Sequence, residues 1–298
     1  MPKKVHRCGY TAIVGRPNVG KSTLLNRIIG QKLAITSHKP QTTRHSILGV
    51  KTTEDGQIVY VDTPGIHKRG DQPMNKYLNR TAKSALADVD LLLFVIEALR
   101  WTDEDDAVLK TIIKYGIPCV LIVNKVDRIK DKEELLPFLA SVASKHAFIE
   151  IIPLSAMNGT NVTELEDKVL AAMPVGNNIY PDDQLTDRSE RFFAAELVRE
   201  QLTQRYSKEI PYALTVEIEG FEVKKDVYHI TTLIWVERKG QKNIIIGKNG
   251  EALKEVATQA RREMEKFFGH KVFLKVWVKV KKSWSTDSKS LHQLGYGN

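Results

Sequence analysis

Two short stretches of the sequence carry residues whose types and spacing suit the binding of a nucleotide. Residues 15–22 read GRPNVGKS and match the phosphate-cradling pattern G-x-x-x-x-G-K-[ST]. Glycines let the backbone approach an anion, the Lys21 ammonium can reach the terminal phosphates, and the Ser22 hydroxyl can ligate Mg²⁺. Residues 124–127 read NKVD. Together the two motifs predict a guanine-nucleotide site.

The Asp127 carboxylate is expected to select the base. A carboxylate accepts two hydrogen bonds from the N1–H and amino groups of guanine, whereas adenine presents an acceptor at N1 and no neighbouring amine. Asn124 is expected to brace the surrounding loops, and the Lys125 stem to cover the base. This motif argues against a P-loop ATPase or kinase.

The residues between these motifs provide the expected hydrolysis machinery. Residues 62–65 read DTPG, in which Asp62 would hold Mg²⁺ through water and the Gly65 N–H would sense the γ-phosphate. Upstream, Thr43 is favoured over Thr42 as the hydroxyl that ligates Mg²⁺ when the γ-phosphate is present. The predicted Mg²⁺ ligands are Ser22, Thr43 and Asp62, and the predicted catalytic residues are Lys21, Thr43 and Gly65.

A fifth, weaker element is Ser155-Ala156, which is supported only by its position at the end of a predicted strand. The residues expected to contact GTP all lie in these motifs. They are Gly15, Arg16, Pro17, Asn18, Val19, Gly20, Lys21, Ser22, Thr23, Asp62, Thr63, Pro64, Gly65, Ile66, Asn124, Lys125, Asp127, Ser155 and Ala156.

Apolar runs that read as strands alternate with helical patterns over the first part of the chain, which predicts an α/β fold with a mainly parallel six-stranded sheet. The strand at residues 46–52 is expected to pair antiparallel with the strand before Asp62. The other predicted strands are 10–14, 58–61, 91–96, 118–123 and 149–154. The predicted helices are 21–29, 74–87, 104–115, 132–146 and 162–173.

Residues 174–187 concentrate Pro, Gly, Asn and Asp without a sustained period, as expected of a linker between domains. At 298 residues the chain can build two cores. The predicted limits are 1–174 for a GTPase domain, 175–187 for the linker, 188–282 for a second domain and 283–298 for a tail.

The net charge of +9 falls within the second domain, because residues 238–282 hold 13 Lys and Arg against four Glu. A compact basic segment suggests a polyanion, with nucleic acid first and anionic lipid second. The amino-terminal residues lack an apolar signal region, and no run approaches the roughly 20 apolar residues that span a bilayer. The sequence therefore predicts a cytoplasmic protein, with peripheral membrane contact as the alternative.

The second domain is predicted to run helix, strand, strand, helix, strand, with IIIGKNG (residues 244–250) before its second helix. This pattern resembles a small α+β KH domain of type II, in which a GxxG loop grips the phosphates of single-stranded RNA. The residues predicted to bind RNA are Ile246, Gly247, Lys248, Asn249 and Gly250 in the loop, and Arg261 and Lys266 on the following helix. The solvated face of that helix is an equal alternative for the two basic side chains.

The motifs GRPNVGKS, PQTTR, DTPGI, NKVD and SAMNG, in this order and followed by the KH-like region, resemble the bacterial Era GTPases over essentially the whole chain. The resemblance implies a monomeric GTPase that uses Mg²⁺, cycles between GTP and GDP, and binds small-subunit ribosomal RNA near its 3′ end during ribosome maturation. Rival hypotheses are an RNA-binding scaffold with a structural nucleotide site and a peripheral membrane GTPase that reads anionic lipid.

One position departs from the Ras pattern. Ile66 follows DTPG where Ras-type enzymes carry the glutamine that orients the attacking water, and an aliphatic side chain cannot make that hydrogen bond. Similar GTPases place K⁺ between the phosphates, so Asn18 is the candidate K⁺ ligand, with bracing of the loop as the equal alternative. His67 is a weaker candidate for a general base.

Overall fold

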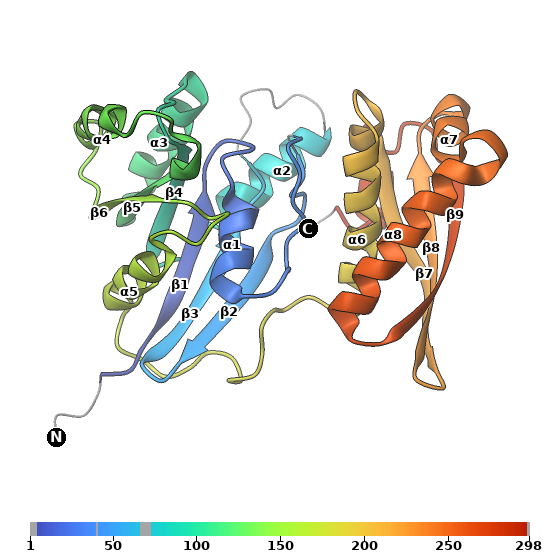
Figure 1. Cartoon of the computed structure of the whole chain (residues 1–298), viewed down its shortest axis with the longest axis horizontal. Coiled ribbons are helices and arrows are strands. Elements are labelled where there is room, and N and C mark those ends of the chain that lie inside the picture. Colours follow the sequence, from blue (N-terminus) through green and yellow to red (C-terminus); the bar gives the residue numbers. More distant parts are fainter. Residues whose placement is uncertain (1–4, 40, 66–72, 297–298) are drawn as a thin grey trace. The chain divides into compact units, whose positions relative to one another are not determined.

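The chain folds as two compact units in the computed structural model (Figure 1). The structure describes residues 5–39, 41–65 and 73–296. Unit 1 ends at Asp187; unit 2 begins at Arg188 and also takes in residues 73–77. Each unit has its own sheet.

Within the described residues, six strands form the sheet of unit 1 in the order β2-β3-β1-β4-β5-β6. β2 pairs antiparallel with β3, and the other neighbouring strands are parallel. The predictions of a mainly parallel six-stranded sheet and of one antiparallel strand are therefore confirmed. The strands are β1 (Arg7–Val14), β2 (Ile47–Thr53), β3 (Gly56–Asp62), β4 (Leu91–Glu97), β5 (Cys119–Asn124) and β6 (Glu150–Leu154).

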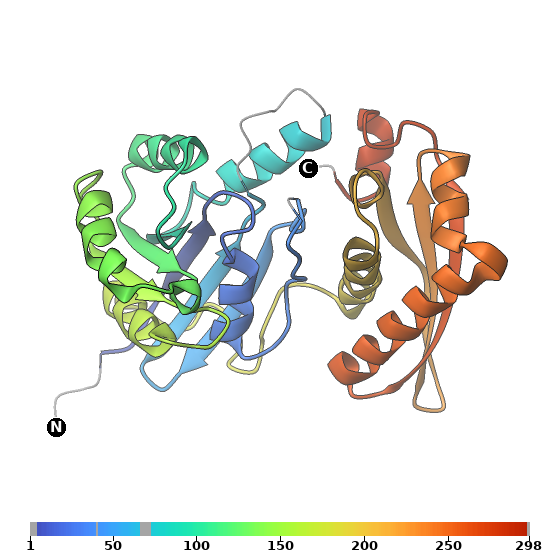
Figure 2. The same ribbon diagram turned by 45° about the horizontal axis from the view of Figure 1, so that its top comes forward.

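Helices cover both faces of this sheet (Figures 1 and 2). The strands β4 and β5 are buried on both faces, which explains why they read as continuous apolar runs rather than as alternating ones. α1 and α5 contact the β1–β3 half, whereas α3 and α4 contribute to the core on the other face. The helices are α1 (Lys21–Ile29), α2 (Pro73–Ser84), α3 (Asp103–Tyr115), α4 (Leu135–Ala143) and α5 (Val162–Ala172).

The topology brings the motif-bearing loops to one edge of the sheet. β1 lies between β3 and β4, so the strand order reverses there, and the loop that follows β1 lies at the switch point where α/β proteins bind ligands. The loops after β3, β5 and β6 begin at the same edge, because all four strands are parallel. The sheet therefore positions the predicted phosphate, magnesium and guanine motifs together.

Residues 132–146 do not form the single helix that the sequence predicted. They form a 3₁₀ turn (Lys132–Glu134), then α4, which ends at Ala143. The Asp131 carboxylate accepts a hydrogen bond from the Glu133 N–H (2.9 Å). Such local capping stabilises a tight turn in place of the first turn of an α-helix.

The segment predicted as a linker lies along the sheet of unit 1. The Val50 N–H donates to the Leu185 carbonyl oxygen (2.8 Å). The Gln57 side chain accepts hydrogen bonds from the N–H groups of Ile179 and Tyr180 (both 2.9 Å) and donates to the Tyr180 carbonyl oxygen (2.9 Å). Because Gln57 is fully buried, these contacts satisfy its amide and attach the segment to β2 and β3.

In the described part of unit 2, three strands form a sheet in the order β7-β8-β9, with α6, α7 and α8 packed on one face (Figures 1 and 2). β7 and β8 are antiparallel, and β8 and β9 are parallel. The elements are α6 (Glu190–Arg205), β7 (Leu214–Lys224), β8 (Val227–Val236), α7 (Lys239–Ile246), α8 (Glu251–Phe268), β9 (Lys271–Val280) and α9 (Ser288–Gln293).

The predicted element order of unit 2 was wrong by one helix, because α7 precedes the GKNG sequence. Gly240 and three consecutive isoleucines disfavour a helix by local propensity. Two tertiary effects override that preference. The Gln241 side chain accepts hydrogen bonds from the N–H groups of Glu237 and Arg238 (both 3.0 Å), and Ile245 is fully buried in the core.

The residues after β9 fold back onto unit 2. Trp284 is fully buried, and its indole N–H donates to the Ala213 carbonyl oxygen (3.1 Å). The Tyr296 hydroxyl lies 2.8 Å from that of Thr215, at the start of β7. The short helix α9, which contributes buried Leu291, lies between these two anchors.

Candidate nucleotide site and nucleic-acid interface

The phosphate loop connects β1 to α1, as its sequence requires. The buried Lys21 ammonium donates to the carbonyl oxygens of Gly15 (3.0 Å) and Arg16 (2.9 Å). Burial lowers the pKa of Lys21 to about 8. Gly20 has a φ of 103°, and a Cβ atom there would lie 2.3 Å from Asn124 Nδ2. The loop therefore packs so closely against Asn124 that no side chain fits at Gly20.

Three oxygen-bearing side chains meet beside the loop. The Ser22 hydroxyl donates to Asp62 Oδ2 (2.7 Å), and Thr43 Oγ1 lies 2.8 Å from Ser22 Oγ and 3.4 Å from Asp62 Oδ2. Asp62 Oδ1 is buried and has no hydrogen-bond partner among the described residues. Burial raises the pKa of Asp62 to about 6, against the opposing effects of Lys21 and the two hydroxyls.

This cluster fits a hard divalent cation. Mg²⁺ prefers oxygen ligands, and a buried carboxylate oxygen without a partner is the group that such an ion would satisfy. The Thr42 hydroxyl instead donates to the Lys39 carbonyl oxygen (2.6 Å). Of the two candidate threonines, the structure brings Thr43 to the oxygen cluster.

The end of β5 joins the guanine motif to two other loops. The Asn124 amide donates to the Val19 carbonyl oxygen (2.7 Å) in the phosphate loop, and its oxygen accepts the Ala156 N–H (3.0 Å). The Ser155 hydroxyl donates to Asp127 Oδ1 (2.5 Å). Asn124 thus fixes the base loop relative to the phosphate loop, and Ser155 orients the carboxylate that would face the base.

A charged network that the sequence did not predict lies behind these loops. Glu97, at the end of β4, pairs with Lys125 Nζ (2.9 Å) and with Arg16 (3.0 Å), and Arg16 also pairs with fully buried Asp105 (3.1 Å). Burial raises the pKa of Glu97, but hydrogen bonds from Lys125 and Arg16 outweigh it and lower the pKa below its ordinary value. No sequence motif marks a single glutamate at a strand end.

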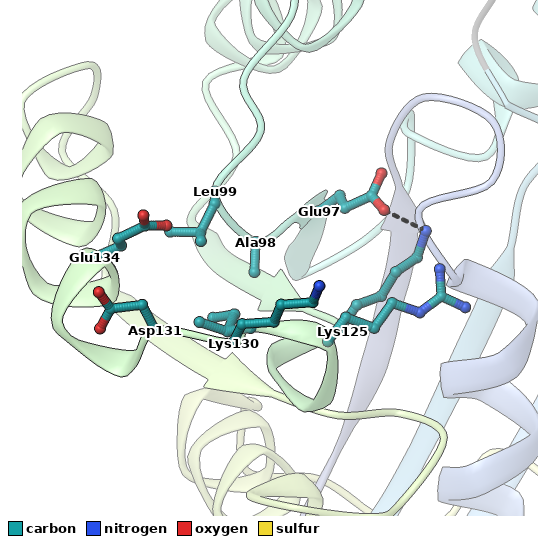
Figure 3. A pocket seen from close by; sticks show the side chains of 9 residues that line it. Glu97, Ala98, Leu99, Lys125, Lys130, Asp131 and Glu134 are labelled. Carbon is teal, nitrogen blue, oxygen red and sulfur yellow. Dashed lines mark hydrogen bonds and ion pairs between the residues drawn. The ribbon is translucent and has the colours of Figure 1, made fainter.

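A hollow of about 330 Å³ opens beside this network (Figure 3). The Lys125 side chain and Glu97 border it on one side, and the 3₁₀ region that holds Asp131 and Glu134 borders it on the other. Several of the residues that line the hollow directly follow the guanine motif in the chain. Lys125 therefore has its ammonium fixed by Glu97 while its stem lines the space next to the base loop.

Other residues that are predicted to contact GTP hold the loops against one another. The Thr63 hydroxyl donates to the Ile13 carbonyl oxygen (2.8 Å), and a Cβ atom on Gly65 would lie 2.9 Å from Pro17 Cγ. The Asn18 amide donates to the His38 carbonyl oxygen (2.8 Å), which is a bracing contact. The predicted contact Ile66 and the candidate base His67 lie outside the described residues.

The GKNG loop of unit 2 connects α7 to α8. Gly247 has a φ of 72°, and a Cβ atom there would lie 2.6 Å from the Ala252 side chain. Asn249 and Gly250 also have positive φ values, of 53° and 80°. Lys248 and Asn249 are exposed at the tip, directly before the first turn of α8. An exposed ammonium at a helix amino terminus suits a phosphate group.

The other predicted RNA residues have partners within the domain. Arg261 pairs with Glu265 (2.8 Å), and Lys266 pairs with Glu263 (3.0 Å), all on α8. Ile246 is partly buried against the core of unit 2. The carboxylates reduce the field that α8 offers to a polyanion, so the GKNG tip is the stronger of the two candidate contacts.

Comparisons with known proteins find relatives of both units. A family model described as 50S ribosome-binding GTPase matches residues 10–125, and a KH domain model matches residues 209–285. The GTPase Era of Azotobacter vinelandii is 55% identical over 290 residues, which is 97% of each chain. The chain belongs to the Era GTPase family. GTPase Era of Ectopseudomonas mendocina is likewise 55% identical and covers 98% of each chain.

Two solved Era structures extend this agreement to three dimensions. A single-residue variant of Aquifex aeolicus Era bound to GDP·AlF4⁻ aligns with a TM-score of 0.95 and 36% identity, over 98% of this chain and 100% of that one. Era in complex with MgGDPNP and nucleotides 1506–1542 of 16S ribosomal RNA aligns with the same score, identity and coverage. The predicted fold, a P-loop GTPase domain followed by a KH domain, is confirmed.

Membership of the Era family makes this chain a GTPase, in agreement with the prediction of an enzyme that hydrolyses GTP. It removes the rival hypothesis of a scaffold without turnover. Among the helices in the described ranges, none combines the length and apolar character needed to cross a bilayer.

Proposed function

We propose that this Era-family GTPase binds small-subunit ribosomal RNA near its 3′ end and acts in the cytoplasm, as a monomer, in maturation of the small subunit. Residues 1–174 would carry the GTPase activity, and residues 188–282 would carry the RNA site. The observation that carries the proposal is the exposed GKNG loop. The chain that presents it shares its fold with a relative whose structure contains nucleotides 1506–1542 of 16S ribosomal RNA.

In the nucleotide site, we infer that Lys21 and the loop N–H groups hold the β- and γ-phosphates and that Asp127 accepts hydrogen bonds from guanine. Ser22 and Thr43 would ligate Mg²⁺, and Asp62 would support the ion through water. When bound, the ion supplies charge neutralisation for phosphoryl transfer. The oxygen cluster of these three side chains supports the assignment.

Turnover is proposed to depend on a monovalent cation held partly by Asn18. Ile66 cannot orient an attacking water, so another group must promote hydrolysis. A cation between the phosphates would do this by stabilising the negative charge of the transition state. Asn18 is exposed in the phosphate loop, with a φ of 65°. GTP hydrolysis by the whole protein should be several-fold faster in K⁺ than in Na⁺ buffer, and Asn18→Ala should remove the difference. Equal rates in the two buffers would leave Asn18 with its bracing contact to His38 alone.

The RNA function is tested by titrating the whole protein, loaded with a GTP analogue, against an RNA with the sequence of nucleotides 1506–1542. Wild-type protein should bind, and Lys248→Asp with Asn249→Asp should bind at least tenfold more weakly. Phosphatidylglycerol vesicles serve as the second probe. If the protein binds vesicles and ignores the RNA, the basic domain reads anionic lipid instead and the RNA assignment is wrong.

A further inference from the structure

The sheet of unit 2 has a second face, away from α6, α7 and α8, and its edge strand has an unusual composition. Alternate residues of β9 point away from the helices, and the burial pattern of the strand shows this alternation. Five side chains are exposed on this face. In order along the strand they are Lys271, Phe273, Lys275, Trp277 and Lys279.

Phe273 and Trp277 are 49% and 59% exposed, which is high for aromatic side chains on a sheet. They lie four residues apart, at about 13 Å along the strand. Lys275 stands between them, with its ammonium 5.6 Å from the centre of the Phe273 ring. The edge therefore alternates flat apolar rings with positive charges.

The neighbouring strand β8 extends this surface. In the parallel register His229 lies beside Phe273, with ring centres 5.3 Å apart, and Trp235 lies beside Lys279. The ammonium groups of Lys279 and Lys281 lie 5.9 Å and 6.0 Å from the Trp235 ring. A hollow of about 510 Å³ follows at this end, bordered by Trp235, Lys279 and the α7 residues Lys239, Lys242 and Asn243.

The third strand, β7, has the opposite charge on this face. Glu217 accepts the indole N–H of Trp235 (2.8 Å), and Glu219 lies 3.9 Å from the Lys279 ammonium. A polyanion would be repelled by this row and attracted to the β9 edge. The charge pattern therefore gives a binding path along β9, between the exposed rings, and not across the whole sheet.

We propose that the open face along β8 and β9 is a second contact surface for single-stranded RNA, with bases stacked on Phe273 and Trp277 and phosphates held by the lysines between them. Proteins bind single strands by combining aromatic stacking platforms with positive charge, and every base offers a ring face. The GKNG loop joins helices on the other face of the sheet, so this surface is separate from it. The proposal rests on the proposed RNA function and extends it.

The test uses the whole protein and the RNA of nucleotides 1506–1542. Phe273→Ala with Trp277→Ala should weaken binding by about tenfold for each stacked ring. Phe273→Tyr with Trp277→Phe keeps both rings and should bind within about threefold of wild type. Val223→Ala, which shortens another exposed apolar side chain on the same sheet, should leave the affinity unchanged.

Direct contact is measured by photocrosslinking with 5-bromouridine in the RNA, and the crosslinked peptide should contain Phe273 or Trp277. This readout applies to the ring-retaining variant even if the alanine variant does not fold. Unchanged affinity of the folded alanine variant, or crosslinks that avoid β9, would overturn the proposal and would leave this face for a protein partner. Failure of the RNA function itself would look different, because the wild-type protein would then not bind the RNA at all.

Discussion

The nucleotide site and the GKNG loop are both proposed to bind through backbone that glycines shape, but they are supported in opposite ways. In the nucleotide site, buried Asn124 holds one loop against another, and buried Lys21 donates to carbonyl oxygens of its own phosphate loop. At the GKNG tip, Lys248 and Asn249 are exposed and depend on backbone conformation. The buried site should therefore respond to single changes with large losses, whereas the exposed loop should respond in smaller, salt-dependent steps.

The largest effect is expected at Lys21. Lys21→Ala removes the ammonium nearest the expected phosphates, and steady-state phosphate release should fall about 10²–10³-fold. Lys110→Ala changes an exposed lysine on α3 and should leave the rate within twofold of wild type. A Lys21→Ala protein that kept more than a tenth of wild-type turnover would contradict the assigned role of the phosphate loop.

Base selection comes next. Asp127→Asn should weaken GTP binding about 100-fold and improve binding of xanthosine triphosphate, because an amide can donate to the oxygen at C2 of xanthine. Calorimetry with both nucleotides measures the change. Asp167→Asn, at an exposed position of α5, should change neither affinity. Retained preference for GTP in the Asp127 variant would place base recognition elsewhere.

The exposed loop provides the contrasting case. Lys248→Asp with Asn249→Asp should weaken RNA binding at least tenfold, and RNA-free GTP hydrolysis should change less than twofold, because neither residue belongs to the nucleotide site. For wild-type protein, neutralising three or four phosphates of a single strand gives a slope near −2 to −3 for log affinity against log salt. A flat salt dependence would contradict a phosphate-gripping loop.

The smallest effect is expected for Glu97, whose substitution should change the stability of the protein. Glu97→Gln removes the charge that pairs with Lys125 and Arg16 and should lower the free energy of unfolding by about 1–2 kcal/mol. The pKa of Glu97 is lowered in the folded protein, so its contribution is present above the unfolded value and is lost as pH falls through the folded value. The stability difference between variant and wild type should therefore shrink in acid, below about pH 4.5. A constant difference from pH 7 to pH 3 would contradict this account.

The sequence predicted those features that depend on local patterns. β1, the phosphate loop and α1 were predictable because a strand, a glycine turn and an amphipathic helix each have their own signal. The antiparallel β2 was predictable because its neighbour in sequence lies a short turn away. The helix α7 was not, since Gly240 and three isoleucines favour other conformations and only packing of Ile245 and the Gln241 cap overrides them.

Features set by tertiary contacts could not be predicted from sequence. Glu97 has no local signature, and its role follows from the parallel register that places it beside Asn124. The Pro- and Gly-rich segment after residue 174 reads as a free linker, yet Gln57, more than a hundred residues earlier, binds it through three hydrogen bonds. Such pairings between distant residues leave no periodic trace in either segment.

The buried tail of unit 2 has a practical consequence for anyone who isolates that unit. A fragment cut after Lys282 would lack Trp284 and Tyr296, and it would open the space that their rings fill beside Ala213 and Thr215. Loss of a fully buried tryptophan costs about 3–5 kcal/mol, a large share of what a domain of this size possesses. A recombinant fragment for spectroscopy should accordingly extend at least to Tyr296, and a purification tag belongs at its amino terminus.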